Sequence, residues 1–148
     1  MRSSRLVNLS FIPMKSPLPP IAESIAQGGR AGSVETAQEG FKLQFVKPEQ
    51  PGSQGLTPEH LFGAAWAACF NGAVLYCAHQ NGHAAEGITV TARVQLQPDD
   101  EKPFSVELLI SLPGVAEDKA HHVIAQAHEM CAYSKATRGR VTVKTTLN

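Results

Sequence analysis

The sequence predicts an α+β domain in which helices pack on a mostly antiparallel sheet. Three observations lead to this prediction: a long apolar segment with helix-end signals, two segments that alternate apolar and polar residues, and a second segment with apolar residues at helical spacing. At 148 residues the chain suits a single domain with a core of its own. We expect a proline-rich arm over residues 1–24 and one domain over residues 25–148.

The long apolar segment is expected to form a helix from Thr57 to about Gln80. Thr57 can cap the helix, and Pro58 suits its first position because the missing N–H costs nothing there. Asn81-Gly82 is a typical C-terminal stop. The segment is apolar on nearly every side, which predicts a buried central helix.

The remaining elements follow from the spacing of apolar residues. Alternation predicts strands over residues 41–45, 88–96 and 104–110, and a last strand over 141–147. Helical spacing predicts a second helix over about 116–130.

Composition excludes several classes of function. Thirteen basic and thirteen acidic residues cancel, so no electrostatic argument favours nucleic acid or an anionic membrane as partner. No stretch approaches membrane-spanning length. Three cysteines, an odd number, argue against a closed set of secreted-type disulfides, so we expect a soluble, cytoplasmic protein. The six histidines have no metal-binding spacing, and no bound metal or cofactor is expected.

Two cysteines distant in sequence point to redox chemistry. Cys69 lies inside an apolar run, and Cys131 follows the second helix, where the negative end of the helix dipole suits a resolving thiol better than an attacking one. A thiolate oxidised by a peroxide becomes a sulfenic acid, which condenses with a second thiol. The alternative is that both are ordinary core cysteines. Cys77 is about 12 Å beyond Cys69 along the same helix and is assigned to packing.

A reactive Cys69 needs a cation, because an apolar setting disfavours the thiolate. Arg30, in the glycine turn of residues 28–32, is the candidate, although it could equally be a solvated loop residue. Glu59 would orient Arg30 through a charge-assisted pair. Glu59 and Cys69 are about 15 Å apart along a straight helix, so either the helix bends near Gly63 or a second subunit supplies the pair. We favour the second subunit.

Four segments carry a resemblance to a known family. They are Gly28-Gly-Arg-Ala-Gly32, Thr57-Pro-Glu-His-Leu-Phe-Gly-Ala-Ala-Trp-Ala-Ala-Cys-Phe70, Ser111-Leu-Pro-Gly114 and Cys131-Ala-Tyr-Ser-Lys-Ala-Thr-Arg-Gly139. In order and spacing, the chain from about residue 25 onward resembles the organic hydroperoxide resistance (Ohr) branch of the OsmC/Ohr family.

The resemblance implies an intertwined α+β homodimer with active sites at the interface. It implies a thiol peroxidase that reduces alkyl and fatty-acid hydroperoxides to alcohols and protects against oxidative stress. A dithiol of the dihydrolipoamide type, carried by a lipoylated protein, would supply the electrons. By position, Cys69 matches the family's peroxidatic cysteine and Cys131 its resolving cysteine, while Arg30 and Glu59 match its activating pair.

The chain departs from the family at three positions near these motifs. Ala132 stands where the family usually has Pro, Lys135 where it has Asn, and His60 where Gln is common. The first two could change how fast the disulfide closes or which reductant docks.

Three aromatic residues near Cys69 are candidates for an apolar substrate pocket. Phe62, Trp66 and Phe70 would favour organic over hydrogen peroxide, and core packing is their other role. Two other functions remain open: a thiol-based redox sensor, and a module that binds an apolar ligand without turnover.

Overall fold

The computed structural model describes residues 21–37, 40–46 and 55–148 of the chain. Its strands form two three-stranded sheets, and the predicted α+β class is confirmed. In chain order the elements are β1 (Ser24–Gln27), the single-turn 3-10 helix η1 (Gly29–Ala31), β2 (Ser33–Thr36), β3 (Lys42–Gln44), α1 (Pro58–Gln80), β4 (Thr89–Leu96), β5 (Phe104–Ser111), α2 (Glu117–Met130), α3 (Ala132–Thr137) and β6 (Thr142–Leu147).

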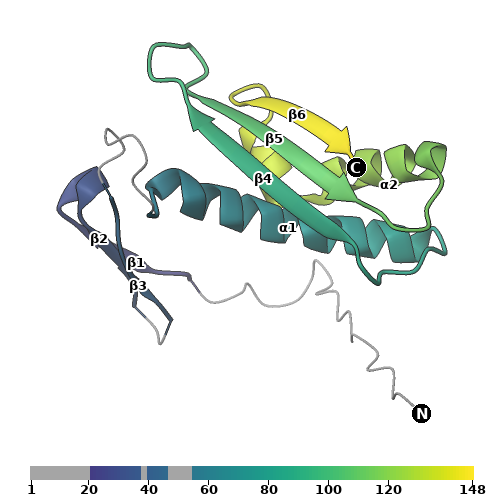
Figure 1. Cartoon of the computed structure of the whole chain (residues 1–148), viewed down its shortest axis with the longest axis horizontal. Coiled ribbons are helices and arrows are strands. Elements are labelled where there is room, and N and C mark those ends of the chain that lie inside the picture. The colour runs from purple at the N-terminus through teal and green to yellow at the C-terminus, as the bar shows by residue number, and fades with distance from the viewer. Residues whose placement is uncertain (1–20, 38–39, 47–54) are drawn as a thin grey trace.

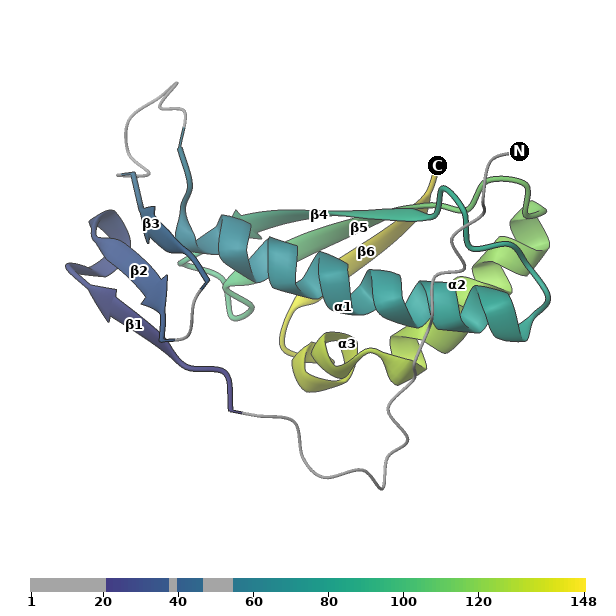
Figure 2. The same ribbon diagram turned by 90° about the horizontal axis from the view of Figure 1, so that it is seen from below.

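The sheet of β4, β5 and β6 forms one layer of the core. β4 pairs antiparallel with β5, whereas β6 lies parallel to β5 because the chain crosses through α2 and α3 before it returns (Figure 1). The predicted alternation holds in β5, where Val106, Leu108 and Ile110 are buried. Figure 2 shows α1 lying across one face of the sheet, and the buried residues of β5 pack in the same core cluster as α1. The core is therefore one layer of sheet under one layer of helices.

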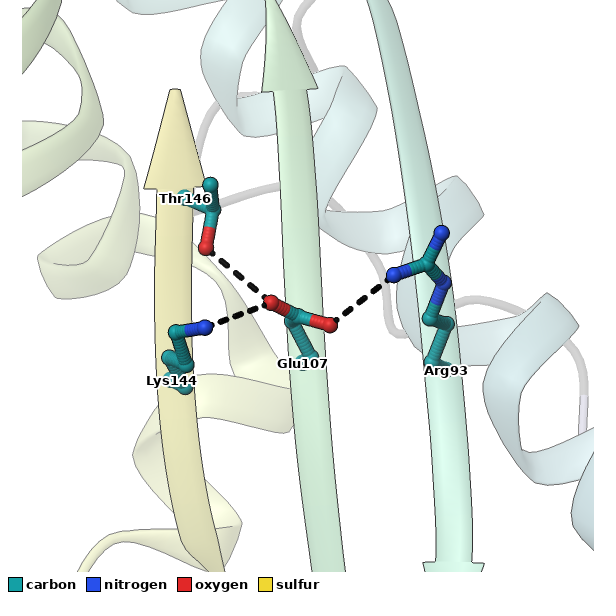
Figure 3. Close-up of polar contacts among 4 residues, drawn as sticks. All are labelled: Arg93, Glu107, Lys144 and Thr146. Atoms are coloured by element: carbon teal, nitrogen blue, oxygen red, sulfur yellow. Dashed lines mark hydrogen bonds and ion pairs between the residues drawn. The ribbon is translucent and has the colours of Figure 1, made fainter. Parts of the chain in front are cut away.

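The opposite face of this sheet is polar, and Glu107 joins its three strands (Figure 3). The Glu107 carboxylate lies 3.2 Å from an Arg93 guanidinium nitrogen on β4 and 3.0 Å from Lys144 Nζ on β6. It also accepts a hydrogen bond from the Thr146 hydroxyl at 3.2 Å. The hydrogen bond from Lys144, followed by those from Arg93 and Thr146, holds the pKa of Glu107 below its ordinary value. These contacts connect the three strands on a face that the candidate site does not use.

α1 begins and ends where the sequence predicts. Thr57 precedes its first residue, and the Thr57 backbone N–H donates to His60 Nδ1 at 3.1 Å, so this histidine satisfies one donor at the helix start. At the other end, Gly82 has φ 77°, the left-handed conformation that commonly terminates helices. The helix runs without a break past Gly63, whose missing Cβ would lie 3.1 Å from Val94 on β4.

Only one face of α1 is buried within the chain, so the prediction of a fully buried helix is wrong for a single copy. The buried residues are Gly63, Trp66, Phe70, Ala73, Val74, Cys77 and Ala78. On the opposite side the small residues Ala64, Ala68 and Gly72 are exposed. Within the described residues, nothing covers this stripe of small apolar residues on α1.

The length of α1 also corrects an expectation about membranes. By length and composition its 23 residues could cross a membrane, contrary to the prediction that no stretch approaches that length. The core helix of a soluble protein passes the same test, and the inner face of α1 packs on β4 and α2.

The sheet of β1, β2 and β3 is thin and open. It lies beyond the first turn of α1, away from the β4–β6 sheet (Figure 1). Every residue of β1 is exposed, and the exposed side chains include Ile25 and Phe41. The strand predicted over residues 41–45 is confirmed, while β1 and β2 were not predicted. β1 begins at Ser24, inside the predicted arm, and residues 1–20 of that arm lie outside the described residues.

Candidate active site

The structure brings the sulfur atoms of Cys69 and Cys131 into contact. Cys69 lies in the middle of α1, and Cys131 lies at the junction of α2 and α3. The Cys131 thiol donates to the Cys69 sulfur, and the two sulfurs are 3.3 Å apart. Both are free thiols. Since a disulfide bond is about 2.05 Å long, the sulfurs need to approach by only about 1.3 Å to bond.

The two thiols differ in their surroundings. Cys69 is half-buried, whereas Cys131 is only 2% exposed. Burial raises the pKa of Cys131, and its contact with Cys69 raises it further, while the backbone N–H and hydroxyl of Ser134 act in the opposite direction. Cys131 lies between the end of α2 and the start of α3, a short helix that was not predicted. The negative end of the α2 dipole is therefore not the only helix end beside this thiol. Burial, rather than the end of α2 alone, keeps this thiol protonated.

Cys77 lies apart from this pair. It is 3% exposed, its thiol contacts the Met130 sulfur at 3.4 Å, and burial raises its pKa. These are the surroundings expected of an inert packing cysteine.

Arg30 and Glu59 form an ion pair at the first turn of α1. The Arg30 guanidinium donates to a Glu59 carboxylate oxygen at 2.5 Å. Partial burial acts to raise the pKa of Glu59, but the hydrogen bonds from Arg30, from the Glu59 backbone and from Thr57, with the charge of Arg30, outweigh it and lower the pKa. Glu59 is therefore a stable anion that can hold the guanidinium in one orientation.

The turn that carries Arg30 depends on glycine. Gly28 and Gly29 have φ of 80° and 66°, which side-chain-bearing residues rarely adopt. A Cβ on Gly32 would overlap the Gln27 carbonyl oxygen. The Gln44 amide on β3 donates to the Ala31 and Gly32 carbonyls at 3.1 and 2.8 Å. Gln44 thus stabilises the turn through two hydrogen bonds, a role that no sequence motif suggested.

The ion pair and the thiol pair do not meet within one chain. Glu59 and Cys69 are ten residues apart on the unbroken helix α1, about 15 Å along its axis. Arg30 extends from its turn to Glu59 and not to the sulfurs. The sequence left two ways to bring Arg30 and Glu59 to Cys69: a bend in the helix near Gly63, or a second subunit. The bend is wrong, because α1 is continuous there.

The three aromatic candidates lie on the inner face of α1. Trp66 and Phe70 are fully buried, and Phe62 is half-buried. Phe62 stacks on Phe104 with ring centroids 5.3 Å apart and meets Trp66 edge-on at 5.7 Å. Within the described residues, the Trp66 indole N–H has no hydrogen-bond partner. All three contribute to the core, and their part in binding a substrate remains a prediction.

His128, to which the sequence analysis gave no role, contacts Phe70 beside Cys69 in sequence and Ser134 close to Cys131. His128 on α2 packs against Phe70, with ring centroids 4.5 Å apart. Its Nδ1 lies 3.1 Å from the hydroxyl oxygen of Ser134, and its Nε2 lies 3.0 Å from that of Thr145. Only the fold reveals this contact, because the three residues come from α2, α3 and β6. Among the described residues, no group of three His, Cys, Asp or Glu side chains could hold a metal ion.

Comparisons with known proteins agree with this geometry. Residues 50–146 match the family described as OsmC-like protein. An organic hydroperoxide resistance protein-like chain of Staphylococcus aureus is 37% identical over 125 residues, covering 82% of this chain and 89% of the relative. A chain of the same name from a second S. aureus strain gives the same figures.

Solved structures give the same result. An organic hydroperoxide resistance protein OsmC from Legionella pneumophila superposes with a TM-score of 0.79 at 34% identity, over 89% of this chain and 99% of the other. The organic hydroperoxide resistance protein OhrB of Bacillus subtilis gives 0.78 at 34%, over 86% and 98%. The chain therefore belongs to the OsmC/Ohr family, in its organic hydroperoxide resistance branch.

Proposed function

We propose that this protein is a cysteine-based peroxidase that reduces organic hydroperoxides to alcohols. The observation that carries the proposal is the 3.3 Å contact between a half-buried thiol, Cys69, and a buried thiol, Cys131. A peroxidase of this kind needs one sulfur that a substrate can reach and a second that can close a disulfide without large movement. The names of the relatives, which concern organic hydroperoxide resistance, agree with this substrate class.

The reaction proceeds in three balanced steps. The Cys69 thiolate attacks the distal oxygen of the hydroperoxide, the O–O bond breaks, and the alkoxide leaves and takes a proton to become the alcohol. Cys69 is now a sulfenic acid, and Cys131 displaces its oxygen as water to form the disulfide. An external dithiol then exchanges with the disulfide, restores both thiols and is itself oxidised.

The active form is a homodimer in which Arg30 of one copy reaches Cys69 of the other. Two observations support this assembly. No other described residue covers the apolar stripe on α1, and Glu59, which holds Arg30, lies about 15 Å along the helix axis from Cys69 of its own chain. A guanidinium beside Cys69 would stabilise the thiolate that attacks the peroxide.

The apolar surroundings of Cys69 favour alkyl and fatty-acid hydroperoxides. Phe62, Trp66 and Phe70 would contribute to the wall of the substrate pocket when the dimer forms. The reductant is a dithiol of the dihydrolipoamide type, presented by a lipoylated protein, and free thiols suit a cytoplasmic location.

The test is a turnover assay with cumene hydroperoxide and dihydrolipoamide. We expect steady loss of peroxide by the wild-type protein, none by Cys69→Ser, and nearly normal loss by Cys77→Ser as the matched control. A single stoichiometric oxidation without turnover would favour a redox sensor instead. If none of the three thiols is oxidised in the presence of peroxide, the result would favour a module that binds an apolar ligand.

A further inference from the structure

A chain of polar contacts connects the buried Cys131 thiol to the protein surface. Ser134, 7% exposed, lies in the first turn of α3, three residues after Cys131, and its backbone N–H and hydroxyl act to lower the pKa of the Cys131 thiol. The Ser134 hydroxyl oxygen is 3.1 Å from Nδ1 of His128. Nε2 of His128 is 3.0 Å from the hydroxyl of Thr145, which is exposed on β6. A pocket of about 340 Å³ opens beside His128 and Ser134. The contacts therefore run from a buried sulfur to solvent.

Disulfide closure needs such a connection. The attacking sulfur must be a thiolate, but Cys131 is a protonated thiol that solvent does not reach. Its proton must leave as the S–S bond forms, and a neutral imidazole is a suitable acceptor. His128 can accept a proton near neutral pH, and it contacts the hydroxyl of Ser134, the residue whose hydrogen bonds lower the pKa of Cys131.

We propose that Ser134 and His128 form a proton relay that deprotonates Cys131 when it attacks oxidised Cys69. The inference rests on the function proposed above. When Cys69 is oxidised, the Cys131 S–H turns from the Cys69 sulfur to the Ser134 oxygen, and its proton passes to that oxygen as the Ser134 proton passes to Nδ1 of His128. The S–S bond forms, the S–O bond of the sulfenic acid breaks, and the oxygen leaves as hydroxide, which takes a proton from solvent. The Cys131 sulfur is oxidised, the Cys69 sulfur is reduced, and His128 later releases its proton. His128 acts through Ser134 and is a positioning residue.

The charges around His128 suit a proton acceptor. Burial lowers its pKa, the Arg138 charge lowers it further, and the Glu129 charge opposes them. Arg138 is paired with Glu129 at 2.8 Å, and the groups from α1 and β6 that contact the ring, Phe70 and Thr145, do not titrate. His128 is therefore neutral at pH 7. Disulfide closure should slow only as the pH falls through the lowered pKa and His128 becomes charged.

The test is a single-turnover measurement of disulfide closure. Excess hydrogen peroxide oxidises Cys69 in the full-length protein, dimedone traps the remaining sulfenic acid at each time, and mass spectrometry quantifies the disulfide. We expect His128→Asn and Ser134→Ala to close the disulfide about 100-fold more slowly than wild type, with the sulfenic acid accumulating. His128→Asn should also lose the decrease in rate at acid pH. His122→Asn, an exposed histidine on the same helix, is the matched control and should match wild type.

Each outcome decides the question. Wild-type closure rates in both variants overturn the relay, as does a slow His128→Asn that keeps the wild-type pH profile, since that indicates a packing defect. A protein that closes the disulfide with hydrogen peroxide but does not turn over cumene hydroperoxide contradicts the proposed function and leaves the relay standing. A protein that forms no Cys69–Cys131 disulfide with any oxidant overturns both.

Discussion

The two ends of the candidate site are built differently. The thiol pair is held by the core of α1, α2 and the β4–β6 sheet, and one chain completes it. The Arg30–Glu59 pair is held by a glycine turn on the open β1–β3 sheet, where the Arg30 side chain is 47% exposed. One chain thus positions its thiol pair unaided, whereas Arg30 lies on an exposed surface, which a second copy would cover in the proposed dimer.

Removing the cation should have the largest effect. We expect Arg30→Ala to lower the second-order rate constant for cumene hydroperoxide by about 100-fold, because the Cys69 thiolate loses its charged partner. Stopped-flow measurement of thiol oxidation checks this. Arg140→Ala, an exposed arginine before β6, is the control and should retain the wild-type rate.

Mixing two variants of little or no activity tests whether the Arg30–Glu59 pair acts across subunits. Arg30→Ala supplies Cys69, and Cys69→Ser supplies Arg30, so a mixed dimer should contain one intact site. After exchange in equal amounts we expect about a quarter of wild-type activity, since half of the dimers are mixed. Activity no higher than that of either variant alone would contradict a shared site.

The difference between the two sheets can be measured as stability. Leu108→Ala leaves a cavity in the β4–β6 core and should lower the free energy of unfolding by about 3 kcal/mol in urea titrations. Ile25→Ala, on exposed β1, should change it by less than about 0.5 kcal/mol when the protein is monomeric. An Ile25→Ala protein that dissociates at higher concentration than wild type in sedimentation would place β1 at the dimer interface.

The glycine turn should matter for rate more than for stability. Gly32→Ala would push the Arg30 turn away from Gln27, so we expect about a tenfold lower peroxidase rate with thermal unfolding of the core little changed. The control is Gly29→Asn, because Asn tolerates φ 66° and a Cβ there meets open space. Equal loss in both variants would mean that the turn tolerates no side chain at all.

The smallest expected effect concerns a departure from the family. Cys131 has φ −62° and ψ 122°, the extended conformation that a residue before Pro prefers, and Ala132 is the first residue of α3. Ala132→Pro should therefore raise the free energy of unfolding by about 0.5 kcal/mol without slowing disulfide closure. Calorimetry and the dimedone assay check the two parts, and a destabilised protein would contradict the first.

Long periodic segments were predictable because their apolar spacing is set by the core they build. β4, β5 and α2 appear where that spacing indicates, and α1, which is apolar on nearly every side, appears where its end signals indicate. The short elements were not predicted: β1 is exposed throughout and has no buried pattern, and α3 is only six residues long. Both depend on pairing or packing that a local pattern does not contain.

The site shows the same division. The Arg30–Glu59 pair was predicted from charge and from family motifs, and its geometry agrees. His128 was missed because its partners, Ser134 and Thr145, are brought to it only by the crossover from α2 to β6. Cys69 and Cys131 were expected to react, but only the fold sets their sulfurs 3.3 Å apart.

In the proposed reaction, the unequal exposure of the two sulfurs would also give electron entry a direction. Cys131 is 2% exposed and Cys69 is half-buried, so an incoming dithiol would reach the oxidised pair more readily at Cys69. The transient mixed disulfide would then form on Cys69, and Cys131 would depart as the leaving thiolate. Regeneration would thus begin at the same atom as oxidation.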